Sequence, residues 1–202
     1  MKFCGLSAKL YDYVLWFLFL GKEKKIRQQI TELIPKNKKI RILDIGCGTG
    51  SQLIEIKTKR EEVGCFGIDS SKDMLKIANQ KAEVKKIKVN FSKQNFSSLS
   101  FKKNYFDFVI AFLALHEVSY EERKAAIKEI ERVMKKTGSF ILVDFKKTQD
   151  LARAIQKSVF FVFEKYADNF IETKEKLLKN FNRKYSKEVL KILSIEKYKK
   201  LN

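Results

Sequence analysis

The sequence predicts an α/β protein in which a doubly wound, mostly parallel sheet carries helices on both faces. From Ile40 onward, short apolar strands alternate with segments of helical periodicity, and this alternation is typical of a parallel sheet. The strand expected at 106–112 is an almost continuous apolar run, which indicates a position buried on both faces. With 202 residues, the chain is long enough for one domain with a substantial core.

Two helices are expected before the first strand, at about 6–20 and 22–34, and Pro35 ends the second one. The apolar run from Tyr13 to Leu20 is too short to cross a bilayer, and no small-residue cleavage site follows it as in a signal peptide. We therefore expect a helix that packs on the domain. The alternative is a membrane-contact helix, for which the aromatic residues would be Trp16, Phe17 and Phe19.

The chain is strongly basic, with a formal net charge of +19. Such a charge favours anionic partners, among them nucleic acid and acidic lipid surfaces. Most of the positive charge is lysine, however, and Lys, Ile, Asn and Phe are frequent together, as in proteins encoded by AT-rich genomes. A nucleic-acid binder would use more arginine to contact phosphates and bases. Nucleic-acid binding and peripheral membrane contact stay open, but neither is the favoured interpretation.

The three cysteines are odd in number and widely separated, and no two of them form a C-x-x-C pair: they are Cys4, Cys47 and Cys65. This pattern predicts neither a disulfide framework nor a metal site, and it is typical of a reducing cytoplasm. We accordingly expect a cytoplasmic protein without a metal.

A glycine-rich turn joins the first predicted strand to the helix that follows it. The stretch Leu43–Gly50 reads Leu-Asp-Ile-Gly-Cys-Gly-Thr-Gly. A turn of this kind lies over the carboxyl end of its strand, where open α/β sheets bind ligands. The carboxylate of Asp44 would repel a pyrophosphate but suits a cationic ligand. S-Adenosylmethionine carries an ammonium and a sulfonium and no phosphate, so it matches this charge.

The stretch Leu43–Gly50 resembles the first motif of the class I S-adenosylmethionine-dependent methyltransferases, and Gly67–Leu75 resembles the second. The pattern is most similar to the small-molecule branch, which includes quinone-biosynthesis and lipid methyltransferases. The resemblance implies a Rossmann-like sheet, S-adenosylmethionine as cofactor and S-adenosylhomocysteine as product. Asp69 ends the second strand, where an acidic residue can accept hydrogen bonds from ribose hydroxyls. Alternatively, Asp69 and the serines after it cap the next helix.

The segment at 94–101 resembles the third cofactor loop of that family, with Asn95 in place of the usual aspartate. The carbonyl oxygen of an asparagine can still accept a hydrogen bond from the adenine amino group. The residues expected to bind the cofactor are Asp44, Gly46, Cys47, Gly48, Gly50, Asp69, Ser70, Met74, Asn95, Phe96 and Leu113.

His116 is the single histidine, and it follows the strand at 106–112, beside the expected methyl donor. An imidazole titrates near neutrality and could take a proton from an acceptor or orient it. The alternative is a histidine that is hydrogen-bonded within its loop. The acceptor is expected to contact Tyr11, His116, Phe160 and Tyr166, and these aromatic side chains suggest an apolar or planar substrate.

The chain is expected to form one methyltransferase domain over residues 1–202. Its parts are an N-terminal helical lid at 1–36, a cofactor-binding core at 37–146, and a helical C-terminal part at 147–202. A last strand is expected at 192–198, but the seventh strand of the family is not apparent. An open sheet edge invites association, so we expect it to be closed by a helix or a partner chain, which gives a monomer or a homodimer.

These observations predict an enzyme that transfers a methyl group from S-adenosylmethionine to a small acceptor by in-line displacement. The protein mainly has to hold the acceptor and the methyl group in line, so a missing catalytic triad is no objection. Two alternatives remain at this stage. The first is an RNA methyltransferase, because of the net charge. The second is a non-catalytic binding or regulatory module that keeps the fold.

Overall fold

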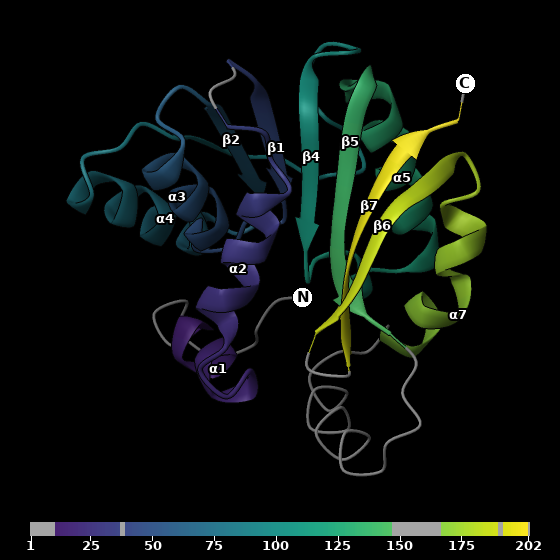
Figure 1. Ribbon diagram of the computed structural model, residues 1–202, viewed down its shortest axis with the longest axis horizontal. Coiled ribbons are helices and arrows are strands. Elements are labelled where there is room, and N and C mark those ends of the chain that lie inside the picture. The colour runs from purple at the N-terminus through teal and green to yellow at the C-terminus, as the bar shows by residue number, and fades with distance from the viewer. Residues whose placement is uncertain (1–10, 37–38, 147–166, 190–191, 202) are drawn as a thin grey trace.

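The computed structural model describes residues 11–36, 39–146, 167–189 and 192–201. Figure 1 shows one twisted sheet with helices packed along it. The helices are α1 (Tyr11–Leu18), α2 (Glu23–Glu32), α3 (Ser51–Lys59), α4 (Lys72–Val84), the 3-10 helix η1 (Leu115–Glu117), α5 (Tyr120–Val133) and α7 (Ala167–Leu177). The strands are β1 (Arg41–Ile45), β2 (Gly64–Asp69), β3 (Asn90–Lys93), β4 (Phe106–Phe112), β5 (Met134–Phe145), β6 (Phe181–Val189) and β7 (Leu193–Lys200).

The sheet has seven strands in the order β3-β2-β1-β4-β5-β7-β6. The pairs from β3 to β5 are all parallel, and β7 runs antiparallel to both of its neighbours. The predicted doubly wound, mostly parallel sheet is therefore confirmed. Because β1 lies between β2 and β4, the chain reverses direction across the sheet there, and loops at such a point leave room for a ligand.

Alternate side chains of the central strands enter two separate apolar layers. On one face, Ile42 packs with residues of α1, α2 and α3, including Leu15 and Ile30. On the other face, Leu43 packs with residues of α5 and α7, including Ile130 and Phe170. Successive residues of a strand point to opposite faces, so a strand covered on both sides must be apolar throughout. This explains why the central strands read as continuous apolar runs.

The expectation that the seventh strand is missing is wrong. β6 and β7 form an antiparallel pair, and β7 inserts between β5 and β6. The part predicted as helical up to about residue 182 contains α7, but β6 begins at Phe181. The reason for expecting a partner chain at an incomplete sheet edge is therefore removed.

The sequence conceals β6 because this strand lies at the edge of the sheet. Phe181 packs with the layer of α5 and α7, whereas Tyr185 and Val189 pack with the layer on the other face, and the register with β7 shifts between Arg183 and Tyr185. The positions between these three residues are mostly exposed and polar, so the sequence lacks the regular alternation of a strand. The place of β7 is fixed by tertiary contacts, because Glu196 accepts a hydrogen bond from Lys174 of α7 (3.0 Å) and pairs with Arg183 of β6 (3.3 Å).

Two predicted boundaries also differ from the observed ones. The sequence at 86–91 predicts a strand, but β3 begins at Asn90, because the amides of Lys85 and Lys86 still bond to carbonyls of α4. The sequence from about Tyr120 to Lys136 predicts one helix, but α5 ends at Val133 and β5 begins at the next residue. Within the described residues, no helix has both the length and the apolarity to span a membrane.

Candidate functional site

The glycine turn after β1 has a backbone that only glycine adopts easily. Gly46, Gly48 and Gly50 have φ angles of +64°, +52° and +74°. The turn is also closely packed, because a Cβ on Gly46 would lie 2.7 Å from the Cβ of Ala114, and one on Gly50 would lie 2.6 Å from the ring of Phe91. The three glycines thus leave backbone groups accessible at the carboxyl end of β1.

Asp69 lies beside this turn, as the parallel pairing of β1 and β2 requires. Its carboxylate accepts hydrogen bonds from the amide of Gly48 (2.9 Å) and from the amide of Ser71 (2.8 Å). The hydroxyl of Ser71 accepts a hydrogen bond from the amide of Met74 and caps α4. Asp69 therefore ties the turn to the start of α4, while Ser71 acts as the cap. This role of Asp69 at the start of α4 is compatible with its predicted role as an acceptor for ribose hydroxyls.

Asp44 is buried in β1, and one of its carboxylate oxygens is unpaired within the described residues. It is 1% exposed, and its Oδ1 has no hydrogen-bond partner among the described residues. Burial raises the pKa of Asp44 to about 7, an effect opposed by the positive charge of Arg27 and reinforced by the negative charge of Asp69. A nearby cation would stabilise the charged form of such a buried carboxylate. This arrangement fits the ammonium and sulfonium of S-adenosylmethionine.

The remaining predicted cofactor residues surround the turn with different degrees of exposure. The Cys47 thiol is buried, and its pKa is raised by burial and by two nearby carboxylates, so it stays neutral and acts in packing. Met74 and Phe96 are half-buried, whereas Ser70 is exposed. Leu113 is buried, has a φ of +53°, and donates its amide to the carbonyl of Val143 (2.8 Å).

Asn95 is exposed, and its side-chain oxygen is engaged within its own loop. This oxygen accepts hydrogen bonds from the amide (3.0 Å) and the hydroxyl (2.8 Å) of Ser97. The atom that would accept from an adenine amino group is thus shared with a local turn. Asn95 differs in this respect from Asp44, whose Oδ1 has no hydrogen-bond partner in the described structure.

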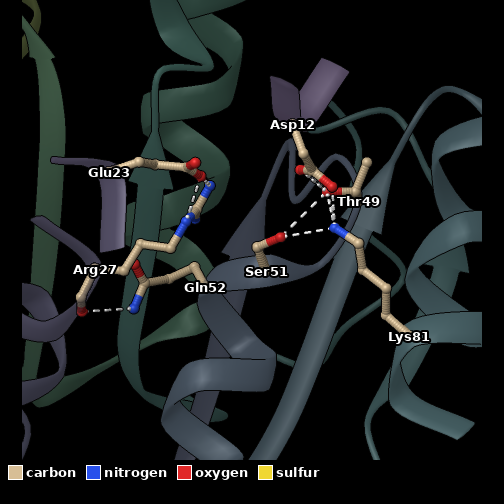
Figure 2. A network of polar contacts seen from close by, with 7 residues as sticks. All are labelled: Asp12, Glu23, Arg27, Thr49, Ser51, Gln52 and Lys81. Carbon is tan, nitrogen blue, oxygen red and sulfur yellow. Dashed lines mark hydrogen bonds and ion pairs between the residues drawn. The ribbon is translucent and has the colours of Figure 1, made fainter. Parts of the chain in front are cut away.

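The N-terminal helix is tied to the glycine turn by a network that the sequence did not reveal (Figure 2). Asp12 of α1 accepts a hydrogen bond from the hydroxyl of Thr49 (2.7 Å) and forms an ion pair with Lys81 of α4. Lys81 also donates to the hydroxyls of Thr49 and Ser51, at 2.9 Å each. Thr49 lies in the predicted glycine turn, but its contacts with Asp12 and Lys81 were not predicted.

A second contact in Figure 2 holds α2 against the core. Arg27 pairs with Glu23 through its Nε (2.8 Å) and lies over the ring of Phe112, 4.5 Å from the centroid. The carbonyl of Arg27 accepts a hydrogen bond from the side chain of Gln52 in α3 (3.3 Å). The guanidinium therefore supplies a fixed positive charge near the buried carboxylate of Asp44.

His116 lies in η1, just after β4, and it is 2% exposed. Its Nδ1 lies 2.6 Å from Oδ1 of Asp144, which is itself 1% exposed near the end of β5. The ring of Phe145 packs edge-on against the imidazole at 4.8 Å. Sequence reasoning missed Asp144, although it is an acidic residue near the end of an apolar strand, as Asp44 and Asp69 are.

A buried arginine lies near this pair. Arg123 of α5 is 0% exposed, donates its Nε to the carbonyl of Val118 (2.9 Å), and lies over the ring of Phe170. Burial lowers the pKa of Arg123, while the negative charge of Asp144 acts in the opposite direction. Arg123 therefore places a positive charge near the buried carboxylate of Asp144.

Three predicted acceptor contacts lie outside the described part of the structure: Phe160, Tyr166 and the side chain of Tyr11. Within the described ranges, no group of three or more His, Cys, Asp or Glu side chains is placed to hold a metal ion.

The parallel sheet, its glycine turn and the carboxylates of Asp44 and Asp69 fit a nucleoside ligand that carries positive charge. Comparison with known proteins identifies the family of the chain. The profile described as "Methyltransferase domain" matches residues 36–195, so the chain belongs to this methyltransferase family. The protein is an S-adenosylmethionine-dependent methyltransferase.

Among curated relatives, carboxy-S-adenosyl-L-methionine synthase of Campylobacter lari is 31% identical over 78% of this chain and 67% of its own length. Demethylmenaquinone methyltransferase of Thermus thermophilus is 30% identical over 68% of this chain and 62% of its own length. The chain thus spans about two thirds of each relative. A crystal structure of an S-adenosylmethionine-dependent methyltransferase from Methanosarcina mazei matches with a TM-score of 0.67 and 26% identity, covering 86% of this chain and 98% of that one.

Proposed function

We propose that the protein transfers a methyl group from S-adenosylmethionine to a small, apolar or planar acceptor that binds beside His116. The observation that carries this proposal is the buried hydrogen bond between His116 and Asp144. Its loop is packed against the glycine turn, since Ala114 occupies the space next to Gly46. The loop that carries the His116–Asp144 pair thus lies close to the turn where the cofactor would bind.

The cofactor would be held by three features of the chain. Asp69 would accept from the ribose hydroxyls, Asp44 would face the positively charged amino-acid part, and the turn at Gly46–Gly50 would give close access to the backbone. When bound, S-adenosylmethionine supplies an electrophilic methyl group on a positively charged sulfur. Met74, Phe96 and Leu113 would provide apolar contacts around the adenosine.

Asp144 would act as a positioning residue for His116. By accepting from Nδ1–H, the carboxylate favours the tautomer in which Nε2 carries the lone pair. His116 would take the proton that the acceptor loses as its new bond to the methyl carbon forms. The resulting imidazolium would be stabilised by Asp144. A base of this kind contributes on the order of 10²–10⁴-fold to a rate.

Two observations support an apolar or planar acceptor. One side of His116 is apolar, since Phe145 packs against its ring and the neighbouring Leu115 is buried. Demethylmenaquinone methyltransferases recur among the relatives, and the name of that enzyme describes an acceptor with an apolar quinone ring. The predicted contacts from Tyr11, Phe160 and Tyr166 belong to this proposal.

The test uses S-adenosylmethionine labelled in its methyl group and separate acceptor panels of reduced quinones, organic acids and RNA. We expect label in the quinone panel, and the substitution His116→Gln should reduce turnover at least 100-fold without weakening cofactor binding. Asp107→Asn is the matched control, because Asp107 lies at the opposite end of β4 and pairs with Lys135. Label in RNA alone, or unchanged turnover in the His116 variant, would refute the proposal.

A further inference from the structure

Helix α1 and the turn after it have one buried side and one exposed apolar side. Leu15 and Phe19 are 5% and 0% exposed and belong to the core. Tyr13, Trp16 and Leu20 are 71%, 59% and 63% exposed. Large apolar side chains exposed together on one short element mark an interaction surface, whereas single exposed ones need no explanation.

Three lysines follow this apolar side directly. Lys22, Lys24 and Lys25 are exposed, and none of them forms an ion pair within the described residues. Gly21, with a φ of +70°, turns the chain back against Trp16, so that a Cβ on this glycine would lie 3.3 Å from the indole nitrogen. The basic segment therefore starts beside the indole ring.

We propose that this surface, made of Tyr13, Trp16, Leu20, Lys22, Lys24 and Lys25, docks on an anionic lipid bilayer. Tyrosine and tryptophan favour the boundary between water and hydrocarbon, since their rings are apolar and their polar ends stay wet. Lysines beside them are attracted to acidic headgroups. The contact is peripheral, with apolar side chains entering the boundary region.

This surface faces away from the core, and the helix that carries it lies close to the glycine turn. Asp12, on the same helix, is tied to Thr49 and Lys81. Figure 1 shows α1 at the edge of the sheet where the parallel strands end. Docking would therefore turn the edge that carries the glycine turn and His116 toward the bilayer. The proposal does not depend on the identity of the methyl acceptor.

The sequence offers a direct probe, because Trp16 is the only tryptophan of the chain. Its fluorescence is measured as the full-length protein is titrated with vesicles of phosphatidylglycerol and phosphatidylcholine, or of phosphatidylcholine alone. With the anionic vesicles we expect a blue shift of the emission, quenching by lipids brominated in the acyl chains, and cosedimentation of the protein. Added salt should weaken the binding.

Two pairs of variants distinguish docking through this surface from nonspecific electrostatic attraction between a basic protein and acidic lipid. Tyr13→Ser with Leu20→Ser should lower vesicle binding at least tenfold, whereas Val84→Ser, at a residue 83% exposed on α4, should leave it unchanged. Reversing the charge of Lys22, Lys24 and Lys25 to Glu should lower binding at least tenfold as well. The control reverses three exposed lysines at the amino ends of β1 and β4, which are Lys39, Lys102 and Lys103.

Three outcomes would overturn the proposal. The first is vesicle binding without a blue shift or quenching, which would assign it to the net charge. The second is an equal loss of binding in both lysine variants. The third is a blue shift that grows with protein concentration in the absence of lipid, which would show that a second copy of the chain covers Trp16. None of these readouts requires methyl transfer, so failure of the proposed function would leave the test intact.

Discussion

Two buried aspartates, Asp44 and Asp144, lie toward the carboxyl ends of β1 and β5 in different surroundings. Each is 1% exposed, and each has one oxygen without a hydrogen-bond partner in the described structure. The other oxygen of Asp144 is engaged by His116, with the charge of Arg123 nearby. Burial raises the pKa of Asp44 to about 7, with the charge of Arg27 acting against this effect and that of Asp69 adding to it.

The difference shows how one fold prepares two carboxylates for separate tasks. A buried carboxylate with a raised pKa gains most from a cation that arrives from outside, which suits a cofactor site. A carboxylate already bonded to an imidazole gains little from a ligand but fixes the orientation of the ring. Changes on the Asp44 side should therefore alter binding, and changes on the Asp144 side should alter turnover.

The largest effect is expected for Asp144→Asn. An asparagine can donate to Nδ1 of His116 and so favours the tautomer that lacks a lone pair on Nε2. Turnover should fall on the order of 10²–10⁴-fold, and the rise of the rate with pH near neutrality should disappear. Calorimetry should give an unchanged dissociation constant for the cofactor. A loss of binding that equals the loss of turnover would contradict the division of tasks.

Asp69→Ala tests the other side of the comparison. The substitution removes the acceptor for two loop amides and for the expected ribose hydroxyls. Hydrogen bonds to a charged group contribute about 1.5–3 kcal/mol each, so cofactor affinity should fall by about 100-fold or more. Asp73→Ala is the matched control, since Asp73 is exposed on the first turn of α4. Equal losses in the two variants would refute the assignment of Asp69.

The pKa of Asp44 predicts a pH dependence of stability. The folded state keeps the proton up to about pH 7, whereas the unfolded state loses it near the ordinary value of 3.8. Stability is therefore unaffected by this group below pH 4 and declines as the pH rises to about 7, by up to a few kcal/mol. Asp44→Asn lacks this decline. Thermal unfolding of the ligand-free proteins should show that the stability of the variant, relative to that of the native chain, increases between pH 4 and pH 7.

The affinity for the cationic cofactor should also depend on pH through Asp44, but it should rise with pH where the stability declines. Because the cofactor favours the ionised carboxylate, its affinity should rise with pH up to about 7 and protons should be released on binding. Calorimetry in buffers of different ionisation enthalpy measures this release. Asp44→Asn should bind more weakly and release fewer protons, and an identical release in both proteins would exclude Asp44 as the source.

The smallest effect is expected for Lys81→Met. The ion pair with Asp12 is about one third exposed, and pairs of this kind contribute about 0–1 kcal/mol. Cofactor affinity should fall by less than about fivefold, while the amides of α1 should exchange hydrogen faster. Lys76→Met, an exposed lysine on the same helix, is the control. Unchanged exchange in α1 would mean that Lys81 does not hold this helix.

The cofactor half of the site could be predicted because its residues are adjacent in the sequence. Asp44 and its glycines lie within one strand and turn, and Asp69 ends the next strand, so a local pattern places them all. Asp144 could not be predicted in this way, because only the pairing of β4 with β5 brings it to His116. The same applies to Lys81, which reaches Asp12 and Thr49 from another helix.

The sequence by itself determined the alternation of strands and helices, the position of the glycine turn and the charge of the ligand that suits it. These features depend on backbone preferences and on neighbours along the chain, which the order of residues specifies directly. The tertiary structure alone decided that the sheet is completed by β6 and β7, that His116 is paired with Asp144, and that Trp16 is exposed while Phe19 is buried. These features depend on contacts between distant segments, where the burial of a side chain is set by what packs against it and not by its type.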